Sequence, residues 1–314
     1  MEQTTPLVTV IVPTYNRAVM IVETLSAILQ QSFKNFELLV ISNGSTDNTE
    51  SVVAGLNDQR IIFFQLPPSG RPAVPRNRGI KEAKGKYIAF CDDDDLWLPD
   101  KLQKQVDFME SNPDTALCFG YAERFGDTDR SGSLLHPTAE SDGVKDFMSL
   151  FLGNKIPTFT VMVRKDCLDE VGCFDEDPKL TAIEDYDLWL RVAHKQKIAC
   201  IPAVLGKYRV HQNNFSSNMV LERMKLLKLV EKFDAKGFID AQQKKSIESN
   251  LFWLIGNAKL RTKEAGFREW FFKAFKNRMN VKSLFALGLC LLPVSVALNL
   301  FSFLEERKNR HSHQ

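Results

Sequence analysis

The stretch Tyr87-Ile-Ala-Phe-Cys-Asp-Asp-Asp-Asp-Leu-Trp97 places four consecutive carboxylates directly after an apolar segment typical of a buried strand. Like charges this close together repel one another and resist removal from water. A divalent cation that also holds phosphate oxygens would remove the conflict, because hard cations such as Mg²⁺ prefer carboxylate oxygen. The alternative is a solvated acidic turn that caps a helix starting near Pro99, where negative charge is favourable. The stretch alone leaves both interpretations open.

The chain of 314 residues is long enough for one large α/β domain with an appendage, or for two modest domains. Its net charge of +2 is unevenly distributed. Residues 1–221 carry 23 Lys/Arg and 30 Asp/Glu, whereas residues 222–282 carry 15 and 7. A basic block behind an acidic body indicates an anionic partner surface. We expect phospholipid rather than nucleic acid, because no nucleic-acid motif accompanies the block.

The six cysteines are scattered and form no CxxC pair. This favours reduced thiols in the cytosol over a disulfide framework or a zinc site. The first six residues also lack the basic-then-apolar pattern of a secretory signal. We therefore expect a cytoplasmic protein.

Apolar, β-branched runs alternate with helical patterns along the first 111 residues. The predicted strands are Val8–Val12, Glu37–Ser42, Ile61–Leu66 and Tyr87–Cys91, and the predicted helices are Arg17–Gln31, Thr46–Leu56, Pro75–Ala83 and Pro99–Ser111. This alternation predicts right-handed βαβ units and a mostly parallel sheet flanked by helices. Polar clusters follow three of the strands, at residues 13–17, 43–47 and 92–95. Ligands of such sheets bind beyond the carboxyl ends of the strands, so the three clusters should converge on one site.

The remaining chain is less regular. We predict strands at Thr115–Phe125, Pro157–Val163, Ile198–Ile201 and Leu205–Val210, a helix at Thr181–Lys195, and amphipathic helices from Val220 to Lys282. The predicted domains are an α/β domain at residues 1–215, a basic helical region at 216–282, and an apolar segment with a basic tail at 283–314.

Residues 283–304 contain no charged side chain. As one helix they would extend about 33 Å, enough to cross a bilayer core. However, Pro293 lies in the middle and both flanks are basic, so the positive-inside rule favours the same side for both ends. We expect a helix pair that bends at Pro293 and dips into one leaflet. A true span and a helix packed within a soluble oligomer are the alternatives.

Five ordered motifs resemble those of the family 2 glycosyltransferases. They are Thr9-Val-Ile-Val-Pro-Thr-Tyr-Asn-Arg17, Gly44-Ser-Thr-Asp-Asn-Thr49, Arg76-Asn-Arg-Gly79, the Asp92–Asp95 run with Trp97, and Glu184-Asp-Tyr-Asp-Leu-Trp-Leu-Arg191. The resemblance covers about residues 7–215. It implies a GT-A fold, a nucleotide-diphosphate sugar donor, a divalent metal (Mn²⁺ or Mg²⁺) and inversion at the anomeric carbon.

The resemblance assigns roles within the carboxylate run. Asp92 and Asp94 match the family's DxD positions, whose carboxylates bind ribose and the metal, and we expect Asp94 to ligate the metal directly. Alternate residues of an extended segment point to opposite faces, so successive carboxylates can serve different partners. Asp93 is a further candidate for substrate binding. For Asp93 and Asp95, helix capping or loop hydrogen bonding is the alternative.

Asp185 is the predicted general base, a role that the resemblance implies. Asp185, Leu188, Trp189 and Val192 share one helical face by their spacing. A carboxylate at the end of an apolar stripe is partly desolvated, which raises its proton affinity and suits it to accept a hydroxyl proton. A simple helix N-terminal charge is the alternative. Asp187 and Arg191, four residues apart, are expected to form a surface ion pair.

The resemblance places other residues around the nucleotide. Pro13, Thr14 and Tyr15 would pack on the base, and Asn16 is expected to cap the next helix. Asn43 stands where the family usually has an acid, so the choice of base stays open.

Two cationic candidates lie further along the chain. Arg76 would contact the diphosphate or the base, with a salt bridge to the carboxylate run as the alternative. His211, in the Tyr208–His211 motif, would approach the diphosphate or the metal, and a structural histidine is the alternative.

These features predict an inverting glycosyltransferase that acts on a sugar or lipid-linked acceptor in cell-surface polysaccharide or glycolipid synthesis, peripherally attached to the cytosolic face of the membrane. A sugar nucleotidyltransferase is disfavoured, because the loop after the first strand is Pro-Thr-Tyr-Asn rather than Gly-rich with Lys or Arg. A membrane-attached carbohydrate-binding protein without turnover is the non-enzymatic alternative.

Overall fold

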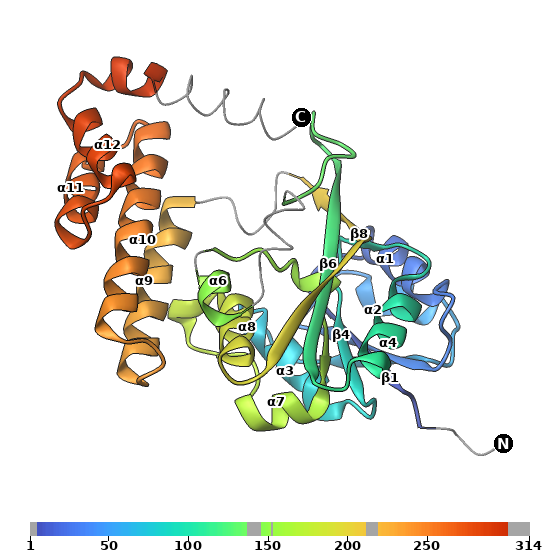
Figure 1. The fold of residues 1–314 in the computed structure, drawn as a ribbon. Helices are drawn as coiled ribbons and strands as arrows, with labels where there is room; N and C mark the ends of the chain where they lie inside the picture. The colour runs from blue at the N-terminus through green and yellow to red at the C-terminus, as the bar shows by residue number, and fades with distance from the viewer. Residues whose placement is uncertain (1–4, 137–145, 152, 212–218, 301–314) are drawn as a thin grey trace. The chain divides into compact units, whose positions relative to one another are not determined.

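The computed structural model describes residues 5–136, 146–151, 153–211 and 219–300 (Figure 1). The chain divides into two compact units, residues 1–215 and residues 216–314. The first is an α/β unit, as predicted, and the second is helical.

The first unit contains an eight-stranded sheet in the order β3-β2-β1-β4-β7-β6-β8-β5. Its strands are β1 (Val8–Thr14), β2 (Phe36–Ser42), β3 (Ile61–Gln65), β4 (Tyr87–Phe90), β5 (Leu96–Trp97), β6 (Thr115–Gly126), β7 (Met162–Arg164) and β8 (Lys197–Val210). The pairs β3–β2, β2–β1, β1–β4 and β6–β8 are parallel, and β7 and β5 pair antiparallel to their neighbours. The sheet is therefore mostly parallel, as predicted.

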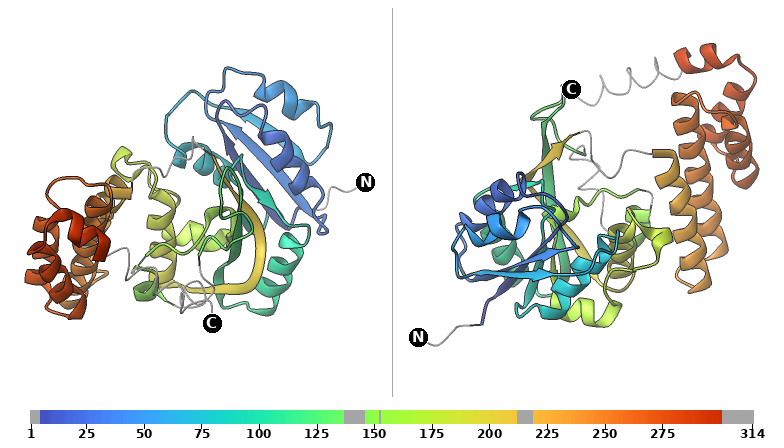
Figure 2. Two further views of the ribbon diagram at one scale, coloured as in Figure 1. Left: turned by 90° about the horizontal axis from the view of Figure 1, so that it is seen from above. Right: turned by 180° about the vertical axis from the view of Figure 1, so that it is seen from behind.

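Helices cover both faces of this sheet (Figure 2). They are α1 (Ile21–Leu29), α2 (Thr49–Ala54), α3 (Ala73–Glu82), α4 (Lys101–Ser111), α6 (Phe147–Phe151), α7 (Lys165–Val171) and α8 (Glu184–Lys195), with short 3₁₀ turns η1 (Thr158–Thr160) and η2 (Pro178–Leu180). The helices α1 and α4 pack on the side of Val10, and α3 packs on the side of Ile11. Gly79 of α3 makes this close approach possible, because a Cβ there would lie 2.6 Å from Ile11 Cγ2. Double-sided cover explains why β1 and β2 are apolar almost throughout.

The structure corrects three predicted elements. Only the end of the predicted strand Pro157–Val163 is extended, because residues 158–160 form η1. The predicted strand pieces at 198–201 and 205–210 are one strand, β8, whose pairing with β6 shifts register near Gly120. The predicted helix at 181–195 begins only at Glu184, because Ala182 has a left-handed φ of 76°.

The second unit contains α9 (Met219–Ala235), α10 (Ala241–Arg261), α11 (Phe267–Asn277) and α12 (Val281–Cys290), followed by a helical stretch at 294–300. Residues 291–293, which include Pro293, interrupt the helical conformation, so the described part of the apolar segment forms two helical pieces rather than one. Ala286, Leu289 and Ala297 of the apolar segment pack into a cluster with Phe267 and Phe271. Among the described residues, no helix combines the length and the apolar character needed to cross a bilayer. Residues 301–304 of the apolar segment and the basic tail lie outside the described residues.

Candidate active site

Polar clusters meet at the carboxyl edge of the parallel strands. The Asn16 N–H donates to Ser45 Oγ (2.9 Å), so the loops after β1 and β2 are joined. The Arg17 guanidinium lies 3.8 Å from Asp93 and 3.9 Å from Asp94, which joins the loop after β1 to the carboxylate run after β4. The convergence that the strand pattern predicted is therefore present.

The four carboxylates of this run have two kinds of environment. Asp95 is 1% exposed, whereas the side chains of Asp92, Asp94 and Asp93 keep 34%, 16% and 12% of their surface exposed. Burial raises the pKa of Asp93 to about 7, and burial together with the charges of Asp94 and Asp92 raises the pKa of Asp95 well above its usual range. Asp92 is thus the most accessible member of the run, and Asp94 and Asp93 keep a smaller exposed surface.

The end of β8 supplies two side chains to the run. The Arg209 N–H donates to Asp95 Oδ1 (2.9 Å), and its Nε donates to the carbonyl oxygen of Asp94 (2.7 Å). His211 Nε2 lies 2.9 Å from Asp94 Oδ2. Asp95 therefore makes a loop hydrogen bond, one of the predicted alternatives, and His211 contacts the predicted metal ligand.

Arg76 joins the carboxylate run to the start of α8. Its Nη2 donates to Asp92 Oδ1 (2.6 Å) and its Nη1 donates to Glu184 Oε1 (2.8 Å). Burial alone would lower the pKa of Arg76, but the charges of Asp92 and Glu184 raise it above its usual value. The salt bridge left open by the sequence is thus formed, with a second carboxylate that the sequence did not indicate. The guanidinium brings residues 92 and 184 into one cluster.

Asp185 follows directly at the N-terminal turn of α8. Its Oδ2 accepts a hydrogen bond from Thr158 Oγ1 (2.6 Å) and its Oδ1 accepts one from the Tyr186 N–H (2.6 Å). Burial, reinforced by the charge of Glu184 and opposed by Thr158 and Arg76, raises the pKa of Asp185 to about 6. The predicted apolar stripe of Leu188, Trp189 and Val192 is completely buried. A carboxylate in this setting holds a proton more tightly than in water and is still mostly ionised at pH 7.

The predicted nucleotide side is formed by the ends of β1 and β2. Pro13 is half-buried, Thr14 is buried and Tyr15 is 54% exposed, so its ring is free to stack on a flat ligand. The Asn43 side chain is held by the Ser69 N–H and hydroxyl, which donate to its Oδ1 (3.1 and 2.8 Å). The prediction that Asn16 caps α1 is wrong. This residue has a φ of 52° and its Oδ1 accepts from the Thr46 N–H (2.8 Å), while the N-cap position of α1 is Met20.

The expected surface ion pair of Asp187 and Arg191 is buried. Arg191 Nε lies 2.9 Å from Asp187 Oδ2, and these side chains are 9% and 0% exposed. The Arg191 guanidinium also donates to the carbonyl oxygens of Val171, the last residue of α7, and of residues 172 and 173, which follow it. The helix spacing indicated the pair correctly, but the packing of α7 against α8 decides its burial.

The sequence did not indicate three of the residues in this cluster. Glu184 and Arg209 lie inside quoted motifs, yet nothing local distinguishes them as partners of Arg76 and of the carboxylate run. Thr158 gave no signal, because its bond to Asp185 joins residues 27 positions apart in the sequence.

The chemistry of these groups fits a divalent cation. Asp92 and Asp94 offer partly exposed carboxylate oxygens, which suit Mg²⁺ or Mn²⁺. No group of three or more His, Cys, Asp or Glu side chains in metal-binding reach was found among the described residues. Such a group is not required, because Mg²⁺ commonly binds through one or two carboxylates together with substrate phosphates.

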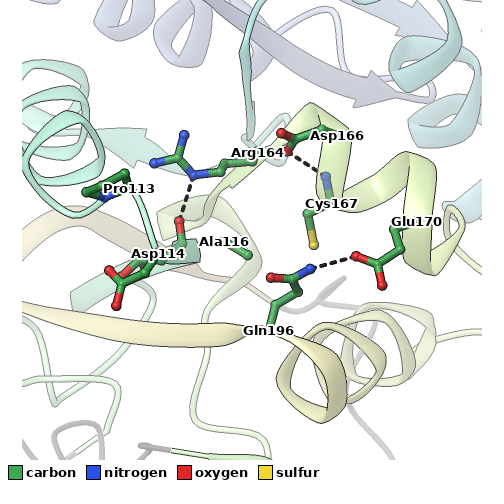
Figure 3. Close-up of a pocket in the computed structure, with 9 residues that line it drawn as sticks. Pro113, Asp114, Ala116, Arg164, Asp166, Cys167, Glu170 and Gln196 are labelled. Carbon is green, nitrogen blue, oxygen red and sulfur yellow. Dashed lines mark hydrogen bonds between the residues drawn. The ribbon is translucent and has the colours of Figure 1, made fainter.

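A separate cavity of about 280 Å³ lies at another part of the sheet (Figure 3). Arg164, Asp166, Cys167, Glu170 and Gln196 are among its lining residues, and none of the predicted site residues is. Arg164 Nε donates to the carbonyl oxygen of Thr115 (2.8 Å), so its guanidinium serves the fold.

Comparison with known proteins identifies the family. The family model "Glycosyl transferase family 2" matches residues 9–170. An uncharacterized glycosyltransferase of Rickettsia typhi is 32% identical over 217 residues, which are 67% of each chain. The glucosyltransferase WfgD of Escherichia coli is 30% identical over 69% of this chain and 82% of its own length. The match covers only 33% of two longer relatives from Rickettsia conorii and Rickettsia felis.

Solved structures share the fold. Staphylococcus aureus TarS 1–349, in complex with UDP-GlcNAc, has a TM-score of 0.61 at 17% identity over 90% of each chain. The mannosyltransferase PcManGT of Pyrobaculum calidifontis, in complex with GDP-Man and Mn²⁺, has a TM-score of 0.60 at 16% identity over 95% of this chain and 87% of its own. The α/β unit thus has the GT-A-like fold that the motifs implied. The chain belongs to glycosyltransferase family 2.

Proposed function

We propose that this protein is an inverting glycosyltransferase that transfers a sugar from a nucleoside-diphosphate donor to a hydroxyl group of an acceptor. The observation that carries the proposal is the pair of salt bridges that Arg76 forms with Asp92 and Glu184, at 2.6 and 2.8 Å. It joins the accessible carboxylates after β4 to the helix start that bears Asp185. A donor-binding group and a proton acceptor are the two elements that such a transfer needs.

The donor diphosphate is proposed to lie beside Asp92 and Asp94. These two carboxylates would hold a divalent cation, with Asp94 as the direct ligand, and the bound cation would stabilise negative charge on the departing nucleoside diphosphate. Arg17, Arg76 and His211 stand around the same carboxylates and can contact the diphosphate oxygens.

Pro13, Thr14, Tyr15 and Asn43 are proposed to receive the nucleoside, and Asp93 is proposed to support the ribose side of the site. The 54% exposure of Tyr15 supports stacking on the base.

Asp185 is proposed to act as the general base. The acceptor oxygen attacks the anomeric carbon and transfers its proton to Asp185, while the bond from that carbon to the diphosphate oxygen breaks and its electron pair leaves with the nucleoside diphosphate. Attack opposite the leaving group inverts the anomeric configuration. The raised pKa of Asp185, about 6, supports this role, because it gives proton affinity without protonating the carboxyl at neutral pH.

The relatives suggest the substrate classes. WfgD is named as a UDP-Glc:alpha-D-GlcNAc-diphosphoundecaprenol beta-1,3-glucosyltransferase. TarS is solved with UDP-GlcNAc and PcManGT with GDP-Man. We propose a nucleoside-diphosphate hexose donor and a lipid-linked saccharide acceptor in the synthesis of a cell-surface polysaccharide or glycolipid.

We also propose that the second unit attaches the enzyme peripherally to an anionic membrane. Leu284, Leu291 and Met279 around α12 are exposed, with Leu291 at 85%, and residues 222–282 carry an excess of basic side chains. Exposed apolar side chains combined with Lys and Arg suit the interface of anionic lipids. Vesicles of phosphatidylglycerol should sediment the full chain, whereas a Leu284→Glu, Leu291→Glu variant should stay in solution. Val19→Glu, at a 91% exposed apolar position of the first unit, is the matched control.

The enzymatic proposal is tested with a panel of nucleoside-diphosphate sugars, lipid-linked acceptors and Mn²⁺ or Mg²⁺. We expect a glycosylated acceptor and a free nucleoside diphosphate from one donor, both lost with EDTA and with Asp185→Asn. Asp114→Asn, at an exposed ion pair with Lys197, is the control and should stay active. Pyrophosphate release would indicate a nucleotidyltransferase instead. No product from any donor would favour a binding protein without turnover.

A further inference from the structure

The turn η1 lies beside the proposed base, although no motif marks it. Thr158 is buried, and its hydroxyl donates to Asp185 Oδ2 at 2.6 Å. The other carboxylate oxygen, Oδ1, accepts from the Tyr186 N–H of the same helix. Thr158 therefore supplies a hydrogen bond that fixes Asp185 from outside its own helix.

Three side chains from β5 and α4 hold consecutive carbonyl groups of this turn. Trp97 Nε1 donates to the carbonyl oxygen of Phe159 (2.8 Å). Gln105 Nε2 donates to that of Thr160 (2.8 Å), and Lys101 Nζ lies 3.5 Å from that of Val161. The three donors follow the carboxylate run in sequence: Trp97 lies on β5, and Lys101 and Gln105 lie one helical turn apart on α4.

These donors are themselves buried, and Lys101 packs on Trp97. Lys101 is 1% exposed, and its Nζ lies 3.7 Å from the centroid of the Trp97 ring. Gln105 is completely buried. Burying a lysine costs free energy unless other interactions compensate for the lost hydration. Here the ammonium group faces an aromatic ring and a carbonyl oxygen. Burial lowers the pKa of Lys101 to about 7.

The strand β8 closes the turn from the other side. The Phe159 ring stacks on Tyr208, with centroids 6.5 Å apart and an angle of 26°. Gly206 makes room for this ring, because a Cβ there would lie 2.7 Å from Phe159 Cε2. The turn is thus held by β5, α4 and β8, all of which adjoin the carboxylate run.

We propose that Thr158 is a positioning residue for Asp185, and that Trp97, Lys101 and Gln105 fix the turn that carries it. This inference rests on the proposed role of Asp185 as the base. An aspartate in the first turn of a helix can rotate about two side-chain bonds, and a second hydrogen bond from a fixed partner restricts it to one orientation. The segment that follows the donor-binding carboxylates thereby orients the group that activates the acceptor.

The hydrogen bond from Thr158 also lowers the basicity of Asp185. A donor to a carboxylate stabilises the ionised form, so the hydroxyl lowers the pKa of Asp185 against the effects of burial and Glu184. Arg76 of α3 acts in the same direction as Thr158. Loss of the hydroxyl should therefore move the acid limb of the rate profile to higher pH and, independently, reduce the rate on the plateau.

The test compares Thr158→Val and Thr158→Ser in the full-length protein by pH profiles of kcat and kcat/KM. Thr158→Val should lower kcat about tenfold or more at pH 8, the scale expected for losing a hydrogen bond to a charged group. Its acid limb should move upward, and KM for the donor should stay within about twofold, as expected when an interaction acts mainly in the transition state. Thr158→Ser keeps the hydroxyl and should restore both properties.

Thr9→Val is the matched control. The Thr9 hydroxyl, which is also buried, donates to the Glu37 carboxylate at 2.6 Å near the start of β1. This variant should lose stability but keep the pH profile. Trp97→Phe, which removes the Nε1 donor to the turn together with part of the buried indole ring, should show a smaller change in the direction of Thr158→Val.

An unchanged kcat and acid limb in Thr158→Val would overturn the inference. Thr158→Ala provides the same comparison if the valine variant does not fold. Failure of the proposed function is distinguishable, because Asp185→Asn would then retain transfer activity. An inactive Asp185→Asn beside a fully active Thr158→Val would refute only the positioning role.

Discussion

The bond of Arg76 to Glu184 is the contact on which the assembly of the site depends, and Arg76→Gln tests it. The two side chains are 8% and 5% exposed, whereas Asp92, the other partner of Arg76, is 34% exposed. Water and salt screen the exposed partner, so the pair with Glu184 should dominate the stability effect. Asp92 is correspondingly free to change partners when a donor binds.

The expected loss of stability in Arg76→Gln follows from the burial of the pair. Removing one member of a buried pair leaves an uncompensated charge, which costs about 3–5 kcal/mol in the free energy of unfolding. Glu184 also accepts from the Ala182 N–H at 2.7 Å, so it cannot swing out to water without breaking the turn before α8. We therefore expect Arg76→Gln to lie toward the upper part of that range. The double variant with Glu184→Gln should recover about 1–3 kcal/mol of the loss, as coupling between contacting residues does.

Urea unfolding of the wild type, both single variants and the double variant measures this cycle. The same helix offers a control, since Arg78 and Glu82 form an ion pair at 3.1 Å with both side chains at least 35% exposed. Glu82→Gln should cost no more than about 1 kcal/mol. If Arg76→Gln were as mild as Glu82→Gln, or if the double variant recovered nothing, the buried bridge would not be what joins the two halves of the site.

Three further predictions follow from the cluster and its surroundings. The kcat/KM of the wild type should fall below about pH 6, because protonated Asp185 accepts no proton. Asp185→Asn should lower the transfer rate by about 10²–10⁴-fold while nucleotide binding persists. A pH profile of kcat/KM that is flat from pH 5 to 8 would contradict the assignment of Asp185 as the base. From pH 7 to pH 9, the unfolding free energy of the wild type should rise by about 2 kcal/mol relative to that of Lys101→Met. In this window the folded protein has lost the proton of Lys101, whose pKa is about 7, whereas the unfolded chain still binds it, so each increase in pH favours the folded state. If the unfolding free energies of the two proteins changed in parallel with pH, the pKa of Lys101 would not be lowered in the folded state. Asp187→Asn should cost about 3–5 kcal/mol in urea unfolding, since Arg191 would keep its charge inside the core, and a loss under 1 kcal/mol would indicate that the pair is solvated after all.

The local patterns of the sequence were sufficient for the first half of the α/β unit. Alternating apolar runs and helical segments predicted β1 to β4 and the helices between them to within a few residues, because central parallel strands are apolar on both faces. The same patterns failed at η1 and at Ala182. At both places a tertiary hydrogen bond or a left-handed backbone, rather than local propensity, determines the conformation.

The family, the parallel order of the first strands and the convergence of the loops that follow them could all be predicted from the sequence. These properties are carried by motif order and by periodicity, which are local. The packing of distant elements sets which carboxylates are accessible, brings Arg76 to Glu184 and Thr158 to Asp185, and buries Asp187 and Arg191. Such contacts join residues between 4 and 108 positions apart, and their burial depends on which elements pack together in space, which no local pattern specifies.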